Sequence, residues 1–290
     1  MDVRYAGASG WFSQCPASLA GIIAPDNTSW GRQISKMTDM SGRHERCSSP
    51  TSAGSLDECG PNEWKAAISR EWRRRMAAKQ SGTPERPRFS LAADSSSEEE
   101  ALAMIDVILS NQLTMSTNVA AFETALAAWL KVPYVCMVNS GSSANLLATA
   151  ALINPERSVR LSQGDEVLVP AVCWSTSVFP IMQLGLTPVF VDTDTRTMNI
   201  DLDHMERLIT AKTKAVMMVH VLGNSCNMAR MMDVVARYKL LVVEDTCESL
   251  GSTVHVAGEQ KYLGTCGDFG TFSFYYSHHM TTGEGGAVCC

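Results

Sequence analysis

The residues with the clearest chemical potential follow short apolar runs in the second half of the chain. The first cluster is Asn139–Asn145, which has the sequence NSGSSAN and leads into a predicted helix. Glycine lets the backbone approach a ligand, serine hydroxyls donate hydrogen bonds, and the N-terminus of a helix favours an anion. The pattern indicates a phosphate site. Serine and glycine before a helix are also common capping residues, so both interpretations stay open.

Trp174 and two acidic residues follow the next apolar runs. Trp174 comes after Glu166–Val169 and could stack on a flat heteroaromatic ring; a tryptophan in the core is the alternative. Asp245 comes after Leu240–Val243, where a buried carboxylate is costly to leave unpaired. It could cap a helix or pair with a protonated ring nitrogen. Glu248 could bond a ring hydroxyl or handle protons, or it could simply be solvated.

The last cluster is Ser273–Gly286, with the sequence SFYYSHHMTTGEGG. A glycine-rich turn ends it, and His278 lies between that turn and the first serine. An imidazole carries protons near neutral pH, so His278 is a candidate acid or base. A further histidine, His220, comes after Ala215–Val219, where a satisfied histidine at a strand end is the favoured interpretation.

Apolar runs and helical segments alternate from about residue 88 onward. This alternation predicts a mainly parallel sheet with helices on both faces. In such a sheet a ligand binds at the carboxyl ends of the strands, which is where these clusters lie. The predicted strands are Tyr134–Val138, Glu166–Val169, Val189–Val191, Ala215–Val219, Leu240–Val243, Thr271–Tyr275 and Ala287–Cys290. The predicted helices lie near Ala101–Ser110, Asn118–Leu130, Ser143–Leu152, Ser175–Leu184, Leu202–Thr210 and Met228–Tyr238.

The order and spacing of these clusters resemble the DegT/DnrJ/EryC1/StrS family of sugar aminotransferases and dehydratases, which use pyridoxal 5′-phosphate (PLP). The resemblance covers roughly residues 88–290. It implies an α/β fold, namely the fold-type I PLP large domain, with a seven-stranded, mostly parallel sheet. It also implies a homodimer. The family has a smaller C-terminal domain after the glycine-rich loop, and we expect that domain to be absent because the sequence ends at Cys290.

The resemblance also assigns cofactor contacts to six positions of this sequence. Gly141, Ser142 and Ser273 would hold the phosphate, Trp174 would stack on the ring, Asp245 would pair with the ring nitrogen, and Glu248 would approach the ring hydroxyl. At the position of His278 most of the family has a lysine that holds PLP covalently. An imidazole cannot form that bond, so PLP, or its pyridoxamine form (PMP), would bind noncovalently and His278 would be the catalytic acid and base.

A histidine at this position is typical of the sugar 3-dehydratases of the family. The implied reaction is PLP- or PMP-dependent removal of the C3 hydroxyl from a nucleotide-linked 4-keto-6-deoxy sugar, with L-glutamate as amino donor, in deoxysugar and polysaccharide biosynthesis. The alternatives are a CDP-4-keto-6-deoxyglucose 3-dehydrase type with an iron–sulfur cluster, an inactive PLP-fold fragment that acts as a binding partner, and a nucleotide-sugar aminotransferase. No metal site follows from the cysteine spacing.

The rest of the chain differs in composition. Residues 1–87 are rich in serine, glycine and proline, so we predict a largely disordered extension that precedes the large domain at 88–290. An apolar stripe over Asn62–Lys79 predicts one amphipathic helix, which either packs on the chain itself or docks on a partner or a membrane surface. The net charge of −6 gives no reason to expect nucleic acid or a membrane as partner, and we expect a cytoplasmic location.

Overall fold

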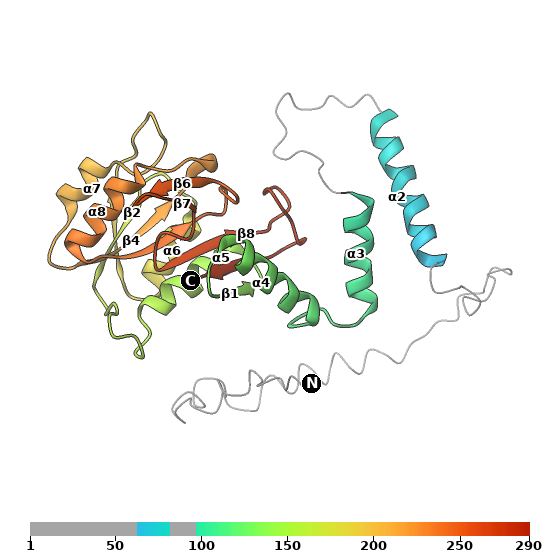
Figure 1. Ribbon diagram of the computed structural model, residues 1–290, viewed down its shortest axis with the longest axis horizontal. Coiled ribbons are helices and arrows are strands. Elements are labelled where there is room, and N and C mark those ends of the chain that lie inside the picture. Colours follow the sequence, from blue (N-terminus) through green and yellow to red (C-terminus); the bar gives the residue numbers. More distant parts are fainter. Residues whose placement is uncertain (1–62, 82–96) are drawn as a thin grey trace, which may run out of the picture. The chain divides into compact units, whose positions relative to one another are not determined.

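The computed structural model describes residues 63–81 and 97–290. Its centre is a seven-stranded sheet with the order β1-β9-β8-β5-β4-β2-β3 (Figure 1). Six strands run parallel to one another, and β9 runs antiparallel to both of its neighbours, β1 and β8. The strands are β1 (Val135–Val138), β2 (Glu166–Pro170), β3 (Thr187–Val191), β4 (Thr213–Val219), β5 (Leu241–Asp245), β8 (Phe269–Ser273) and β9 (Gly286–Cys289). The α/β prediction is confirmed.

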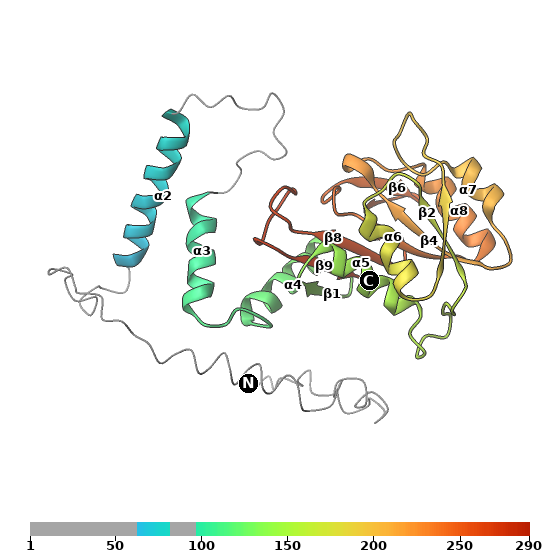
Figure 2. The same ribbon diagram turned by 180° about the vertical axis from the view of Figure 1, so that it is seen from behind.

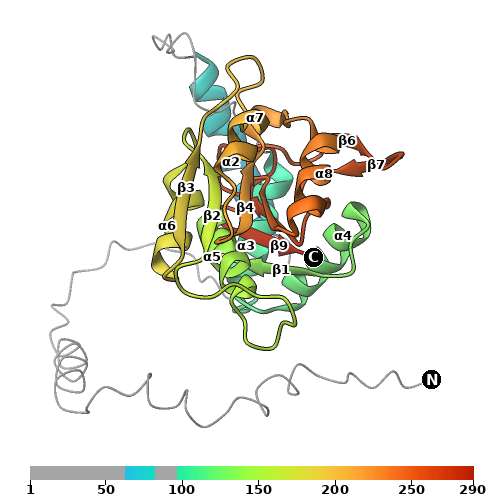
Figure 3. The same cartoon turned by 90° about the vertical axis from the view of Figure 1, so that its left-hand side faces the viewer.

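Helices cover both faces of this sheet, as Figures 2 and 3 show from two further directions. On one face lie α5 (Gly141–Leu152) and α6 (Ser175–Gln183), and on the other lie α7 (Leu202–Leu208) and α8 (Met228–Tyr238). Also on the α7/α8 side, α4 (Thr117–Leu130) packs on β8 and β9 through Leu126 and Leu130.

The strands bury alternate residues on opposite faces, as the period of two requires. Along β4, Ala215 and Met217 join the core beneath α5 and α6, whereas Val216 and Met218 join the core beneath α7 and α8. Strand β5 follows the same rule, because Val243 faces α5 and α6 and Val242 faces the other side. This alternation decides on which face each polar residue at the end of β5 must lie.

Two elements differ from the sequence-based expectation. Strand β8 ends at Ser273 rather than Tyr275, because Ser273 forms the last pair with β9, opposite Gly286. A small hairpin of β6 (Thr253–Val256) and β7 (Glu259–Tyr262) was not expected at all. A short 3-10 turn, η5 (Val221–Gly223), follows β4.

The segment for which we predicted an amphipathic helix forms the helix α2 (Glu63–Ser81), and a further helix, α3, spans Glu98–Leu109. Arg73 pairs with Glu98 at 2.7 Å and Lys65 pairs with Asp106 at 2.8 Å, so part of the basic face of α2 is neutralised within the chain. No helix in the described part of the chain combines the length and apolar character that crossing a bilayer requires. The boundary that we predicted between residues 87 and 88 and the remainder of the predicted extension lie outside the described residues.

Candidate active site

The carboxylate of Asp245 is the centre of a buried polar cluster at the carboxyl end of β5. Its Oδ2 accepts hydrogen bonds from Asn145 Nδ2 at 2.8 Å and from Ser177 Oγ at 2.8 Å. Its Oδ1 accepts one from the Cys247 N–H at 3.2 Å. Asp245 lies on the face of the sheet that α5 and α6 cover, which explains why one donor comes from each of these helices. The carboxylate is therefore satisfied and held in one orientation.

The N-terminus of α5 contacts the end of β8 at this cluster. A Cβ atom on Gly141 would lie 2.6 Å from Ser273 Cβ and 2.9 Å from Cys247 Sγ, so only glycine permits this approach. Ser140 caps the helix, because its Oγ accepts a hydrogen bond from the Ser143 N–H at 3.1 Å. Ser142 is exposed at the first turn. The capping interpretation of this segment is confirmed for Ser140, and the phosphate site at the next two residues stays a prediction.

The glycine-rich turn brings β9 against the same helix end. A Cβ atom on Gly286 would lie 2.3 Å from the Ser140 carbonyl oxygen, so the turn needs glycine at this position for steric reasons. The base of the loop is closed by two backbone hydrogen bonds: Phe274 N–H donates to the Gly285 carbonyl at 2.9 Å, and Thr282 N–H donates to the Phe274 carbonyl at 3.1 Å.

His278 lies on this loop, half-buried, with its backbone N–H donating to the Tyr275 carbonyl at 3.0 Å. Burial is the main reason that the pKa of its imidazole falls below the usual 6.5. The negative charge of Glu248 opposes this shift, His279 adds to it, and Asp245 again opposes it. The imidazole therefore lies within electrostatic reach of both acidic residues. Being neutral at neutral pH, it is able to accept a proton there. His279 itself is exposed.

Trp174 and Glu248 border the cluster without being buried in it. Trp174 is 75% exposed at the start of α6, which rules out the alternative of a core tryptophan. No aromatic ring in the described part of the chain contacts its indole. Glu248 is exposed, and its Oε2 accepts a hydrogen bond from the Leu222 N–H at 3.1 Å, in the left-handed turn that follows β4.

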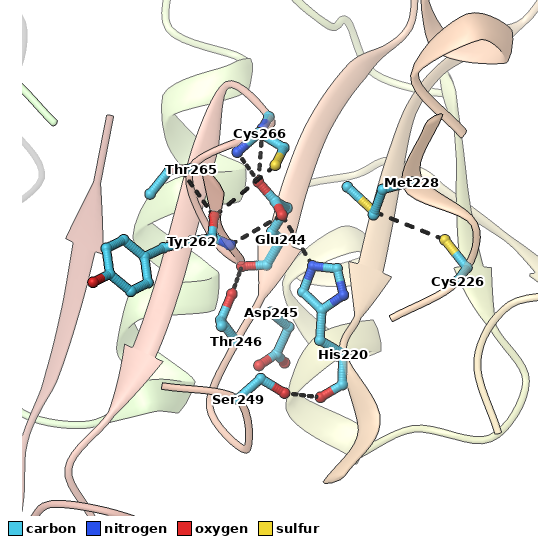
Figure 4. A network of polar contacts seen from close by, with 12 residues as sticks. His220, Cys226, Met228, Glu244, Asp245, Thr246, Ser249, Tyr262, Thr265 and Cys266 are labelled. Carbon is cyan, nitrogen blue, oxygen red and sulfur yellow. Dashed lines mark hydrogen bonds and ion pairs between the residues drawn. The ribbon is translucent and has the colours of Figure 1, made fainter. Parts of the chain in front are cut away.

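The other carboxylate of β5 belongs to a separate network, on the opposite face of the sheet (Figure 4). Glu244 is fully buried and accepts hydrogen bonds from His220 Nε2 at 2.9 Å and from three backbone N–H groups, those of Gly264, Cys266 and Gly267. Burial alone would raise the pKa of Glu244, but the hydrogen bond and charge of His220 and the backbone donors outweigh it, so the pKa lies below its usual value. His220 is the satisfied strand-end histidine that the sequence favoured.

The structure thus gathers Gly141, Ser273 and Asp245 into one cluster and places Ser142 and His278 on the segments around it. Sequence reasoning assigned no role to three buried polar residues that support the cluster, although the first of them lies at the end of the Asn139–Asn145 segment. They are Asn145, Ser177 and Thr271. Their signal in the sequence is weak, since each is an uncharged polar residue of a kind that is common near the start of a helix or within a strand. A buried polar side chain of this kind needs a partner, which here is the carboxylate or one of its donors.

Comparison with known proteins identifies the family of the chain. Residues 94–290 match the DegT/DnrJ/EryC1/StrS aminotransferase family. GDP-4-keto-6-deoxy-D-mannose 3-dehydratase from Yersinia pseudotuberculosis is 42% identical over 200 residues, which cover 69% of this chain and 50% of that protein. The chain spans about half the length of the curated relatives it matches.

Two solved structures show the same similarity in three dimensions. One is the E. coli GDP-4-keto-6-deoxy-D-mannose-3-dehydratase with bound hydrated PLP, at a TM-score of 0.64 and 40% identity, covering 69% of this chain and 50% of that one. The other is a GDP-4-keto-6-deoxymannose-3-dehydratase with a trapped PLP-glutamate geminal diamine, at a TM-score of 0.64 and 39% identity, covering 69% and 51%. The family match extends over well more than half of the chain. The chain belongs to the DegT/DnrJ/EryC1/StrS aminotransferase family.

Proposed function

We propose that this chain contributes the cofactor site of a PLP- or PMP-dependent 3-dehydratase, which removes the C3 hydroxyl from a nucleotide-linked 4-keto-6-deoxy sugar. The observation that carries the proposal is His278. The loop from Ser273 to Gly286 contains no lysine, and it presents instead a half-buried imidazole within electrostatic reach of Glu248 and Asp245. Such a loop suits proton transfer and excludes a covalent bond to the cofactor through an amine at this position.

The residues of the cluster fit the cofactor at its phosphate end. At the start of α5, the Ser143 N–H is bonded to Ser140 Oγ and the Ala144 N–H to the Ser140 carbonyl. Within the described part of the chain, the N–H groups of Gly141 and Ser142 have no such partner, as expected for the first turn of a helix. These two donors, at the positive end of the helix, and the hydroxyl groups of Ser142 and Ser273 form a donor set suited to a phosphate dianion.

The donor and acceptor set also fits the ring. Asp245 Oδ1 accepts one hydrogen bond in the structure and has the capacity for another, which suits a protonated ring nitrogen. The exposed indole of Trp174 offers a face for stacking, and Glu248 is the candidate partner for the ring hydroxyl. When bound, the cofactor supplies an electron sink beside the sugar carbons.

His278 would then perform the proton transfers. Its neutral imidazole would take a proton from the C4′ carbon of the cofactor and pass it to the C3 hydroxyl oxygen of the sugar as that group leaves. Because burial already lowers its pKa, the imidazole is unprotonated at neutral pH and ready for the first of these steps. We further propose L-glutamate as the amino donor, a homodimer, and a cytoplasmic location.

The test uses the 290-residue chain, PMP, L-glutamate and GDP-4-keto-6-deoxymannose, with release of ammonia as the readout. Ammonia formed in proportion to the loss of the C3 hydroxyl supports the proposal. Transfer of the amine onto the sugar without loss of that hydroxyl would indicate an aminotransferase and contradict it, as would failure to bind PLP or PMP. His278→Lys is the informative control: it is expected to form a covalent bond with PLP that borohydride makes permanent, whereas the natural chain is not.

A further inference from the structure

A continuous line of hydrogen bonds runs from the interior of the sheet to the Asp245 carboxylate. Thr271 on β8 donates from Oγ1 to Asn145 Oδ1 at 2.6 Å, and Asn145 on α5 donates from Nδ2 to Asp245 Oδ2 at 2.8 Å. Thr271 and Asn145 are fully buried. The three residues come from three different elements, so this line fixes the position of α5 and β8 relative to the end of β5.

The side-chain amide of Asn145 has one satisfactory orientation. Its Nδ2 donates to Asp245 and lies 3.3 Å from the Thr176 carbonyl oxygen, while its Oδ1 accepts from Thr271. A reversed amide would place Oδ1 against a carboxylate oxygen and a carbonyl oxygen, neither of which donates. The Thr271 hydroxyl also lies 3.3 Å from the Glu244 carbonyl, but its single hydrogen serves the much shorter contact to Asn145. The Asp245 carboxylate and the Thr176 carbonyl therefore fix which end of the amide faces Asp245, and Thr271 holds the opposite end through its donated hydrogen bond.

The donors are distributed unequally over the two carboxylate oxygens of Asp245. Oδ2 receives the side chains of Asn145 and Ser177, both at 2.8 Å, whereas Oδ1 receives the Cys247 N–H at the longer distance of 3.2 Å. Because two side chains hold Oδ2, they fix the orientation of the whole carboxylate. The less occupied oxygen is the one with room for another N–H donor.

We propose that Thr271 is a positioning residue for the ring nitrogen of the cofactor: it holds Asn145 in place, and Asn145 anchors Asp245 Oδ2 and leaves Oδ1 to accept the ring N–H. This inference rests on the proposed function, because it assigns Asp245 to a pyridoxal-type ring. Thr271 itself does not touch the cofactor. Its hydroxyl is fully buried and committed to Asn145, so its removal acts only through the line of hydrogen bonds.

The test compares Thr271→Val, which keeps the shape but removes the hydroxyl, with Thr271→Ser, which keeps the hydroxyl. PLP is titrated into each full-length variant by absorbance, and the spectrum of bound PLP is then followed against pH. In Thr271→Val we expect about tenfold weaker binding, since the loss of one buried hydrogen bond is of that order. We also expect the pH at which the ring nitrogen loses its proton to fall. Thr271→Ser is expected to restore both quantities toward the natural chain.

A purely structural role for Thr271 would change stability without moving the protonation of bound PLP, so the spectral midpoint separates the two roles. Urea unfolding without cofactor serves as the folding control. If Thr271→Val does not fold, Asn145→Ala replaces it, because that change removes the amide itself and predicts the same two shifts. Natural affinity and an unchanged spectral midpoint in a folded variant overturn this inference alone. A natural chain that binds neither PLP nor PMP overturns both this inference and the proposed function.

Discussion

Glu244 and Asp245 are consecutive carboxylates that face opposite sides of the sheet and perform unrelated tasks. Glu244 accepts three backbone N–H groups and His220 (Figure 4). Asp245 accepts two side chains and one backbone N–H at the carboxyl end of β5. The alternation of side chains along β5 separates them. A substitution of Glu244 should therefore change the stability of the fold, whereas a substitution of Asp245 should change the proposed binding of the cofactor.

Glu244→Gln is expected to destabilise the fold by about 3 kcal/mol, because a buried acceptor is replaced by a group whose amide hydrogens face N–H donors. Urea unfolding measures this loss. Glu259→Gln is the matched control: Glu259 is exposed on β7, so the same change should alter stability by no more than about 0.5 kcal/mol. Equal unfolding midpoints for Glu244→Gln and the natural chain would show that the Glu244 network contributes nothing.

Acid should remove the stabilisation that Glu244 supplies. Its pKa in the folded chain lies below its usual 4.5, so the folded state binds fewer protons there than the unfolded state does. The contribution is therefore fully present above pH 4.5 and is lost as the pH falls through the lowered value. Unfolding free energies measured against pH for the natural chain and for Glu244→Gln should converge in acid. A difference that stays constant down to the lowest pH at which both fold would contradict this assignment.

His278→Asn should reduce dehydration by about 10²- to 10⁴-fold while leaving PLP bound, because it removes the proton carrier and none of the proposed cofactor contacts. The natural chain should lose activity as the pH falls through a value below 6.5, where the imidazole becomes protonated. His279→Asn is the control: because His279 is exposed, this variant is expected to keep most of the dehydration rate. Full dehydration activity in His278→Asn would remove the acid–base role.

Gly141→Ala should weaken both stability and cofactor binding. Its new Cβ atom would lie 2.6 Å from Ser273 Cβ, so β8 and α5 would have to separate. Overpacking of this kind costs about 1–3 kcal/mol, which urea unfolding can measure. Ser142→Ala provides the comparison: it removes an exposed hydroxyl without a clash, so it should bind PLP less tightly and change stability by no more than about 0.5 kcal/mol. Natural stability in Gly141→Ala would mean that the contact with Ser273 is not tight.

The sequence predicted the large elements well because their signals are strong. Apolar runs such as Ala215–Val219 lie within strands that are buried on both faces, and α8 begins and ends where its apolar stripe does. The β6–β7 hairpin has no comparable signal. Its two-residue turn uses Ala257 and Gly258, both with positive φ, in place of the asparagine–glycine or aspartate–glycine pair that usually marks such turns.

The residues of the candidate site also differ in how well the sequence predicts them. Asp245 and His278 were predictable because an ionisable group at a buried strand end or on a glycine-rich loop needs a partner, which a ligand can supply. The supporting residues Asn145 and Thr271 were not, because nothing local distinguishes them from other polar residues; their partners lie 100 and 126 positions away in the chain. Only the folded arrangement reveals such long-range pairs.

The loop that carries His278 is held at its base by contacts that do not involve the His278 side chain. Backbone hydrogen bonds at Phe274 and the close packing of Gly286 on Ser140 hold its two ends, and neither depends on the identity of the side chain at position 278. Replacing histidine by lysine at this position would exchange an imidazole for an amine while the backbone contacts that hold the loop stay the same. Divergence of chemistry within such a lineage thus requires no remodelling of the scaffold.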